Sequence, residues 1–121
     1  MSTRCNIKIL ERFDSIPIWI YHHHDGYMEG VGADLNNRLA NRRNWYAADI
    51  ANQLVKDTKD EYEITTSQHG DIEYLYVIYC ENKIMEVWTE RYIENSYCED
   101  GVEISWVKIA KIDYKKISEQ I

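Results

Sequence analysis

The stretch His22-His23-His24-Asp25-Gly26-Tyr27-Met28-Glu29-Gly30-Val31-Gly32 decides how this chain folds, because a strand pattern enters it and a helix pattern leaves it. It holds three of the four histidines and three of the five glycines. Asp-Gly is a strong turn signal, and the later glycines let the backbone bend or approach another group closely. We expect the chain to reverse direction here, and we expect any functional site to lie in this loop.

Two strands are predicted before the loop. Residues 4–10 alternate apolar and polar side chains, which is typical of a half-buried strand. Residues 16–22 are apolar on both sides, which indicates a strand covered on both faces, and Pro17 lies near its start, where strands tolerate proline. The two runs can pair as an antiparallel hairpin.

Two helices are predicted after the loop. Residues 34–43 can form a weak helix. A stronger helix follows Asn44, which can serve as its N-cap, because apolar residues recur at helical spacing from Tyr46 to Val55. A stripe of this kind normally faces a core, so we assign it no cofactor.

The second half of the chain is predicted to form strands. Residues 72–80 are almost entirely apolar or aromatic, which favours the central strand, whereas residues 111–121 fit a strand or a short helix equally well. The other predicted strands are residues 61–67, 83–90, 102–110 and, as an optional one, 91–100. The order is therefore ββααβββ(β)β. It predicts an α+β fold, an antiparallel β-sheet with two helices packed on one face, in a single domain spanning residues 1–121.

Charge and aromatic content limit the partners. The formal net charge is −7, and all of it arises from residues 61–121, so we do not expect general binding to nucleic acid. Ten tyrosines and four tryptophans stand against one phenylalanine, a composition that suits half-exposed sheet faces and interfaces. We expect a homo-oligomer on this basis.

Cysteine usage and hydropathy indicate a cytoplasmic protein. Cys5, Cys80 and Cys98 are odd in number and lack the spacing of a structural zinc site or a disulfide framework. Arg4 and Lys8 interrupt the first apolar run, so no signal peptide is expected, and no stretch has the length of a membrane span. We expect no membrane partner and no cofactor.

The three consecutive histidines resemble metal ligands, but strand geometry weakens the pattern. Consecutive strand residues point to opposite faces, so only His22 and His24 can share one. With Asp25 or the distant His69 they could complete a set that iron or zinc accepts. No other ligand spacing supports a metal. The alternative is a set of polar residues that hydrogen-bond a tight turn.

An anion site is the second possibility. Arg38 and Arg42 lie four positions apart and could hold a phosphate or carboxylate together; the alternative is a solvated helix face. The glycine spacing matches neither a P-loop nor a dinucleotide fingerprint. We name no catalytic residue, because Cys5 and Cys80 fall in strand patterns, where thiols are usually buried and inert. The candidate ligand-binding residues are His22, His24, Asp25, Tyr27, Glu29, Arg38 and Arg42.

Three segments resemble a group of small phage and prophage proteins. They are Met1-Ser2-Thr3-Arg4, then His23-His24-Asp25-Gly26-Tyr27-Met28-Glu29-Gly30, then Gly70-Asp71-Ile72-Glu73-Tyr74-Leu75-Tyr76. Met28 stands where the pattern of the group usually has proline. The resemblance implies a phage accessory protein, and small proteins of that kind often counter host defences.

Three hypotheses follow. The first is a non-enzymatic binding protein that inhibits a host defence protein stoichiometrically through an acidic, aromatic sheet face. The second is a sponge that sequesters a cyclic nucleotide immune signal by aromatic stacking and arginine contacts, with Tyr27, Arg38 and Arg42 as its candidates. The third is a small metal-dependent enzyme that uses His22, His24 and Asp25. We favour a binding protein over an enzyme.

Overall fold

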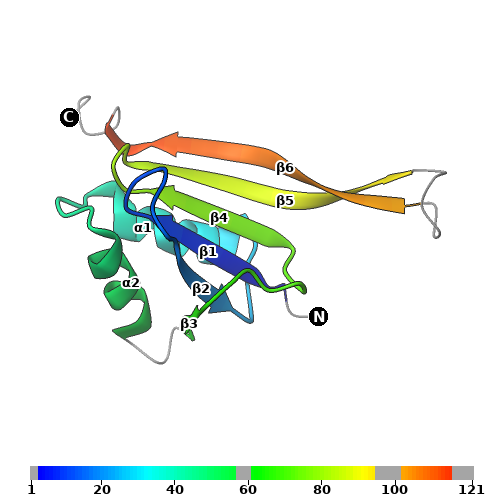
Figure 1. The fold of residues 1–121 in the computed structure, drawn as a ribbon, viewed down its shortest axis with the longest axis horizontal. Helices are drawn as coiled ribbons and strands as arrows, with labels where there is room; N and C mark the ends of the chain where they lie inside the picture. The colour runs from blue at the N-terminus through cyan, green and yellow to red at the C-terminus, as the bar shows by residue number, and fades with distance from the viewer. Residues whose placement is uncertain (1–2, 57–60, 95–101, 116–121) are drawn as a thin grey trace.

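A six-stranded sheet organises the structure, a computed structural model that describes residues 3–56, 61–94 and 102–115. The spatial strand order is β3-β2-β1-β4-β5-β6 (Figure 1). The strands are β1 (Cys5–Leu10), β2 (Ile18–His22), β3 (Glu63–Thr65), β4 (Tyr74–Tyr79), β5 (Ile84–Glu94) and β6 (Val102–Asp113). A π-helical turn, η1 (Met28–Gly32), leads into helix α1 (Ala33–Ala40), and helix α2 (Ala47–Lys56) follows. The predicted α+β class is confirmed.

Both helices pack on the same face of the sheet. The core there joins Ile7, Ile9, Ile20, Tyr76 and Ile78 of the sheet to buried helix residues. Those helix residues are Leu35, Leu39, Ala47, Ile50, Ala51 and Leu54. They lie at helical spacing, so each helix buries one stripe and leaves its polar side in solvent.

The sheet is mixed, although the sequence predicted an antiparallel one. The six strands are joined by five pairings. The central pairing, β1 with β4, is parallel, and the other four are antiparallel. The chain reaches this arrangement because β3 and β4 lie on opposite sides of the β1–β2 hairpin. The connection between them therefore crosses the sheet, and sequence periodicity carries no information about that crossing.

Strand boundaries in the second half differ from the prediction in two places. The segment 91–100 does not begin a new strand within its described part, since β5 continues unbroken to Glu94 and pairs with β6 throughout. In the tail, β6 extends to Asp113 and a helical turn follows at Tyr114. The remainder of both segments lies outside the described residues.

The start of α2 is held by a residue that the sequence did not indicate. Asn44 accepts a hydrogen bond from the Tyr46 backbone N–H at 2.9 Å, so it orders the turn that precedes the helix. At the helix start itself, the Ala47 N–H donates to the Glu11 carboxylate at the end of β1. A carboxylate suits a helix N-terminus, and this one anchors α2 to the sheet. No helix in the described part of the chain is long and apolar enough to cross a membrane.

Candidate functional site

The glycine-rich loop is built by tight backbone packing. Asp25 adopts a positive φ of 51°, and its carbonyl accepts a hydrogen bond from the Val31 N–H at 2.7 Å. A Cβ at Gly30 would lie 2.2 Å from that same carbonyl oxygen, and a Cβ at Gly26 would lie 2.9 Å from the Cys5 Cβ. Both distances are too short for any side chain. The glycines are therefore required by the turn from β2 into η1.

The histidines at the end of β2 are drawn into that turn. The His22 Nδ1 lies against the His24 backbone, within hydrogen-bond distance of its carbonyl oxygen, and the His22 ring packs 4.7 Å from the Tyr62 ring. The His22 and His24 ring centroids are 6.4 Å apart. Among the described residues, no three His, Cys, Asp or Glu side chains converge in a way that could hold a metal ion. The arrangement matches the alternative of polar residues that hydrogen-bond a tight turn.

His23 and His24 contact acidic residues near β3. His24 Nε2 lies 3.0 Å from Glu61 Oε2, and His23 Nε2 lies 3.5 Å from Glu63 Oε1. With Tyr62, these four residues line a hollow of about 460 Å³. All four side chains are about half exposed, so each pair contributes little to stability.

The remaining candidates of the loop face solvent. The Tyr27 hydroxyl donates to Asp25 Oδ1 at 3.0 Å, and this hydrogen bond to a carboxylate raises the pKa of Tyr27. Tyr27, Glu29 and Asp25 are exposed. The structure therefore brings Asp25 and Tyr27 together but gives them no enclosed space.

The two candidate arginines already have partners within the protein. Arg38 Nε donates to Asp34 Oδ2 at 2.9 Å, and Tyr62 donates to the same oxygen at 2.7 Å. Arg42 donates to the Asn44 backbone carbonyl and to Gln53. These contacts join α1, α2 and the segment before β3. The pair thus ties the helices together and does not present a joint anion site.

A cluster around His69 covers one end of the sheet face opposite the helices. The sequence analysis did not predict this cluster. The His69 ring stacks on Tyr21 with centroids 3.9 Å apart, and the Tyr21 hydroxyl donates to Asp71 at 3.0 Å. Beneath them, Asn6 is fully buried, donates to the Ile20 carbonyl and accepts from the His69 N–H at 2.7 Å. The β3–β4 connection is therefore pinned across β1 and β2. The signal in the sequence for this contact is Asn6, a polar residue within the alternating pattern of β1.

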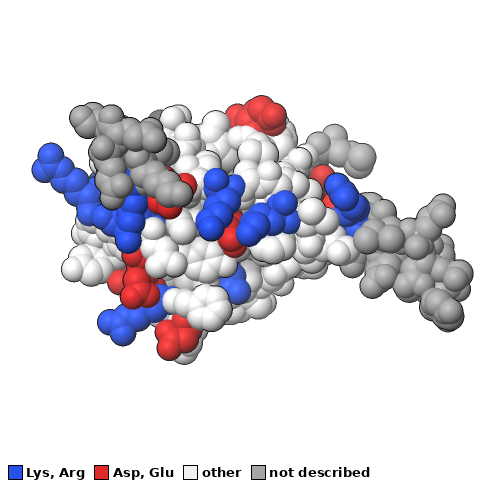
Figure 2. All heavy atoms as spheres, turned by 90° about the horizontal axis from the view of Figure 1, so that it is seen from above, with Lys and Arg blue, Asp and Glu red and all other residues white. Residues whose placement is uncertain are grey.

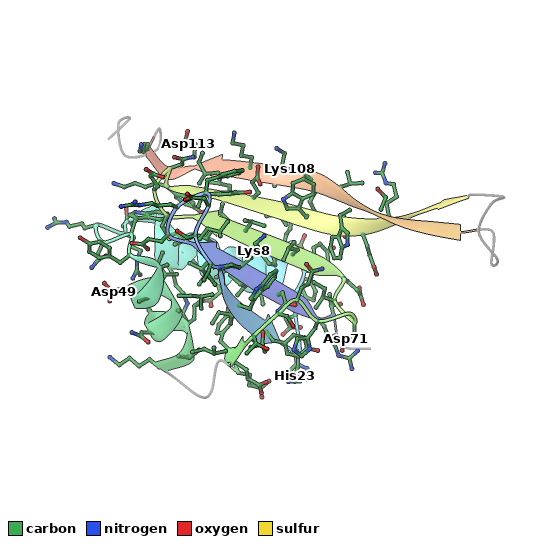
Figure 3. All side chains as sticks on the ribbon, viewed as in Figure 1. Lys8, His23, Asp49, Asp71, Lys108 and Asp113 are labelled. Carbon is green, nitrogen blue, oxygen red and sulfur yellow. The ribbon has the colours of Figure 1, made fainter. Side chains whose placement is uncertain are left out.

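Beyond that cluster, no helix or strand of the described residues covers the sheet face opposite the helices (Figure 3). Residues opposite one another in register share a face, so two rows run across five strands. The first row is Trp19, Lys8, Val77, Glu86 and Lys111, and the second is Tyr21, Asn6, Leu75, Trp88 and Lys108. We call the part of these rows not covered by His69 the open face.

Lysines lie over the tryptophans of the open face. Lys8 Nζ is 5.5 Å from the Trp19 ring centroid, and Lys108 Nζ is 5.8 Å from that of Trp88. Lys108 also contacts Glu86 at 3.1 Å, and Tyr79 makes a second side-chain hydrogen bond to Glu86. Burial alone would raise the pKa of Glu86, but the two hydrogen bonds outweigh it and lower this pKa below its ordinary value. Cation–π contact and ion pairing thus order the side chains of this face before any partner binds.

The charge on the open face is mixed. Its lysines Lys8, Lys108 and Lys111 share the described sheet with Glu86 and, at the rim, Glu90 and Asp113. Figure 2, which is turned by 90° from Figure 1 so that the β6 side is nearest the viewer, shows basic and acidic groups interspersed over a largely uncharged surface on that side as well. The acidic face expected from the sequence is therefore an aromatic face with balanced charge.

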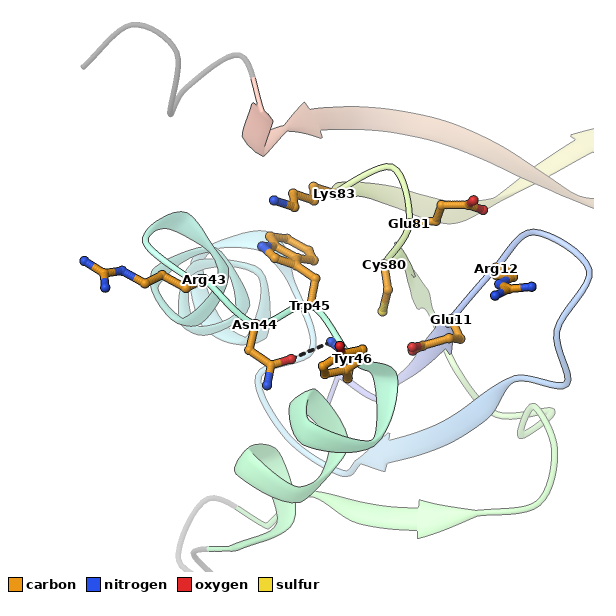
Figure 4. A pocket seen from close by; sticks show the side chains of 9 residues that line it. All are labelled: Glu11, Arg12, Arg43, Asn44, Trp45, Tyr46, Cys80, Glu81 and Lys83. Carbon is orange, nitrogen blue, oxygen red and sulfur yellow. Dashed lines mark hydrogen bonds between the residues drawn. The ribbon is translucent and has the colours of Figure 1, made fainter.

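A second hollow lies at the other end of the sheet, away from the glycine-rich loop. It has a volume of about 620 Å³ and is formed where β1 and β4, the parallel pair, both end (Figure 4). Its lining residues are Glu11, Arg12, Arg43, Asn44, Trp45, Tyr46, Cys80, Glu81 and Lys83. We call it the Trp45 cavity. None of its residues had been singled out as ligand-binding from the sequence.

Comparison with known proteins gives this surface no precedent. No family model, curated protein or solved structure matches the chain.

Proposed function

We propose that this protein is a non-enzymatic binding protein that inhibits a protein partner stoichiometrically through the open face. The observation that carries the proposal is the pair of lysine-covered tryptophans, Trp19 and Trp88, on a sheet face that no helix covers. Tryptophan is enriched among the residues that supply most of the binding energy at protein interfaces, whereas lysine is depleted there. The two tryptophans are therefore the residues of the open face that can anchor a partner.

A folded protein is the partner class that this surface fits best. Balanced charge on the open face, with a net charge of −7 for the whole chain, disfavours a polyanion such as nucleic acid. Leu75 adds apolar area next to Trp88, and Glu86 and Lys111 supply polar groups in the neighbouring row. An apolar centre with a charged margin is the usual arrangement at protein–protein contacts.

The resemblance to small phage and prophage proteins supplies the biological setting. We propose that the partner is a component of a host defence system and that inhibition takes place in the host cytoplasm. The size of the chain, 121 residues, is consistent with an inhibitor that acts by occupying a surface. This step is an analogy, and it names the class of partner only.

Self-association is a separate part of the proposal. Strand β6 is a twelve-residue edge strand, and an edge of that length presents unpaired backbone groups to which a second copy can add. Its lysines at 108 and 111 protect the edge in part. Light scattering on the purified protein should give the mass of a dimer or a larger homo-oligomer; a monomer at high concentration would contradict this part.

Phage plating tests the main proposal. The protein is expressed in bacteria that each carry one defence system, and the plating efficiency of a sensitive phage is measured. We expect one system to be suppressed by the wild type and suppression to fall at least about 100-fold with Trp19→Thr/Trp88→Thr, because both anchors are lost. The matched control, Phe13→Thr/Ile16→Thr, removes two highly exposed apolar residues from the β1–β2 turn and should suppress normally. Suppression of no system, or equal suppression by the open-face variant, contradicts the proposal.

A further inference from the structure

The Trp45 cavity has the size and position of a small-ligand site. Its volume of about 620 Å³ lies within the range of roughly 300–1,000 Å³ typical for small-molecule pockets. Three segments far apart in the chain form it: the end of β1, the α1–α2 connection and the β4–β5 turn (Figure 4). It shares no residue with the open face, so its role is independent of the inhibitor proposal.

Three cations, Arg12, Arg43 and Lys83, line the cavity. No carboxylate in the described part of the chain pairs with Arg12, Arg43 or Lys83. In Figure 4, Arg43 and Lys83 lie on the Trp45 side, with the Arg43 side chain pointing outward, and Arg12 lies across the cavity beside Glu11. Cations that pair with no described carboxylate are unexpected around a concave surface in a chain with a net charge of −7, and they favour an anionic ligand.

The acidic residues of the cavity do not neutralise these cations. Glu11 Oε2 accepts a hydrogen bond from the Ala47 N–H at the start of α2. In Figure 4 the carboxylate of Glu11 is accordingly turned toward Tyr46. Glu81 extends away from the Trp45 side. Neither acidic residue of the cavity therefore pairs with the positive groups near Trp45, and Glu11 Oε1 remains able to accept a hydrogen bond from a ligand.

An exposed aromatic ring lies beside these groups. Tyr46 is 64% exposed, a high value for so large a side chain, and its backbone is fixed by the 2.9 Å hydrogen bond to Asn44. The neighbouring Trp45 indole is held in place by its 3.0 Å hydrogen bond to the Arg42 carbonyl. A fixed backbone with an open ring is suited to stacking against a planar group.

From this combination we propose that the Trp45 cavity binds a nucleotide. Its phosphate contacts Lys83 and the exposed Arg43, whose side chain turns toward the cavity on binding, and its base stacks on Tyr46. Glu11 Oε1 accepts from an exocyclic amino group, so adenine and guanine nucleotides bind more tightly than uracil ones. Arginine and lysine side chains bind phosphate through charge-assisted hydrogen bonds, which are stronger than neutral ones.

Isothermal titration calorimetry on the full chain tests the site with AMP, GMP, UMP, adenosine and inorganic phosphate. We expect AMP or GMP to bind at least 10-fold more tightly than UMP, adenosine or phosphate. Arg43→Ala/Lys83→Ala should weaken nucleotide binding at least 10-fold, and Tyr46→Ala at least 5-fold, while a matched loss of one exposed cation at the far end of α2, Lys56→Ala, should leave it unchanged. All substituted residues except Lys83 are exposed, and thermal melts check the folding of each variant.

Three results would overturn the proposal. The first is the absence of binding by any nucleotide at millimolar concentration. The second is binding that the cavity variants leave unchanged. The third is phosphate binding as tight as that of AMP, because it would show that the ring of Tyr46 contributes nothing. None of these results bears on Trp19 and Trp88, so the failure of this site and the failure of the inhibitor proposal can be told apart.

Discussion

The Tyr76 hydroxyl, in the centre of the sheet, donates a 2.7 Å hydrogen bond to the Gly26 carbonyl oxygen in the glycine-rich loop, and both groups are buried. A Cβ on Gly32 would lie 3.2 Å from the same hydroxyl oxygen and 3.4 Å from Cε1 of the Tyr76 ring. This one side chain therefore sets the path of the chain from β2 into α1. The glycine-rich loop therefore has a structural role, and the Tyr76 side chain attaches it to β4.

Tyr76→Phe should destabilise the protein while leaving its fold intact. The substitution leaves the buried Gly26 carbonyl without a donor, which costs about 1–3 kcal/mol in the free energy of unfolding. Tyr46→Phe is the matched control, since its exposed hydroxyl makes no hydrogen bond with the described residues. Urea unfolding followed by circular dichroism measures both. Equal stability of the two variants would contradict the role of Tyr76.

Gly30→Ala should be far more damaging than Gly70→Ala. A methyl group at residue 30 would lie 2.2 Å from the Asp25 carbonyl, so the backbone of the turn must move, whereas a methyl at residue 70 meets nothing within 4 Å. We expect a loss of roughly 3 kcal/mol for the first and less than about 0.5 kcal/mol for the second. Thermal melts compare them directly. A Gly30→Ala protein that melts with the wild type would show that the turn is more adaptable than its geometry indicates.

Asn6→Ala should release the β3–β4 connection from the sheet. The Asn6 side chain joins the Ile20 carbonyl to the His69 N–H, and its loss costs about 2–4 kcal/mol because buried backbone groups lose partners. Amide exchange at His69 should accelerate more than exchange at Ile7 in the same strand as residue 6. Asn37→Ala, on the exposed side of α1, is the control. Unchanged exchange at His69 would contradict the anchoring role.

Stability should fall in alkaline solution. Burial raises the pKa of the Cys5 and Cys80 thiols from 9.0 to about 12, and raises the pKa of Tyr114 from 10.0 to about 12. These groups ionise at lower pH in the unfolded chain, so their contribution is complete below about pH 9 and is lost as pH rises toward 12. Unfolding in urea at half-unit steps from pH 8 to 11 measures the decline. Constant stability to pH 11 would show that these groups are not buried in solution.

Sequence patterns were sufficient for the local elements and insufficient for their assembly. Alternation predicted β1, and helical spacing predicted the buried stripe of α2, because both depend on residues close in the chain. The parallel β1–β4 pair depends on a crossing connection, and the cap from Glu11 to Ala47 joins residues 36 positions apart. Neither leaves a local pattern.

The candidate site was predicted less well than the fold, for the same physical reason. Histidines, arginines and glycines in sequence suggest chemistry, but their role depends on which partners the fold supplies. Arg38 donates a hydrogen bond to Asp34, Arg42 donates one to Gln53, and His22 contacts the backbone of the turn at His24. Arg12, Arg43 and Lys83 meet around one cavity only because three distant segments converge there. Spacing along the chain cannot reveal such a group.

The most direct test of the inhibitor proposal is a titration of the purified defence component whose activity the protein suppresses. Activity is followed over time at increasing ratios of inhibitor to component. We expect inhibition to be complete at a fixed stoichiometric ratio, constant in time, and displaced to at least about 100-fold higher concentration by Trp19→Thr/Trp88→Thr. Inhibition that deepens with time at substoichiometric amounts would show turnover and contradict a binding protein, and full potency of the double variant would contradict the open face as its surface.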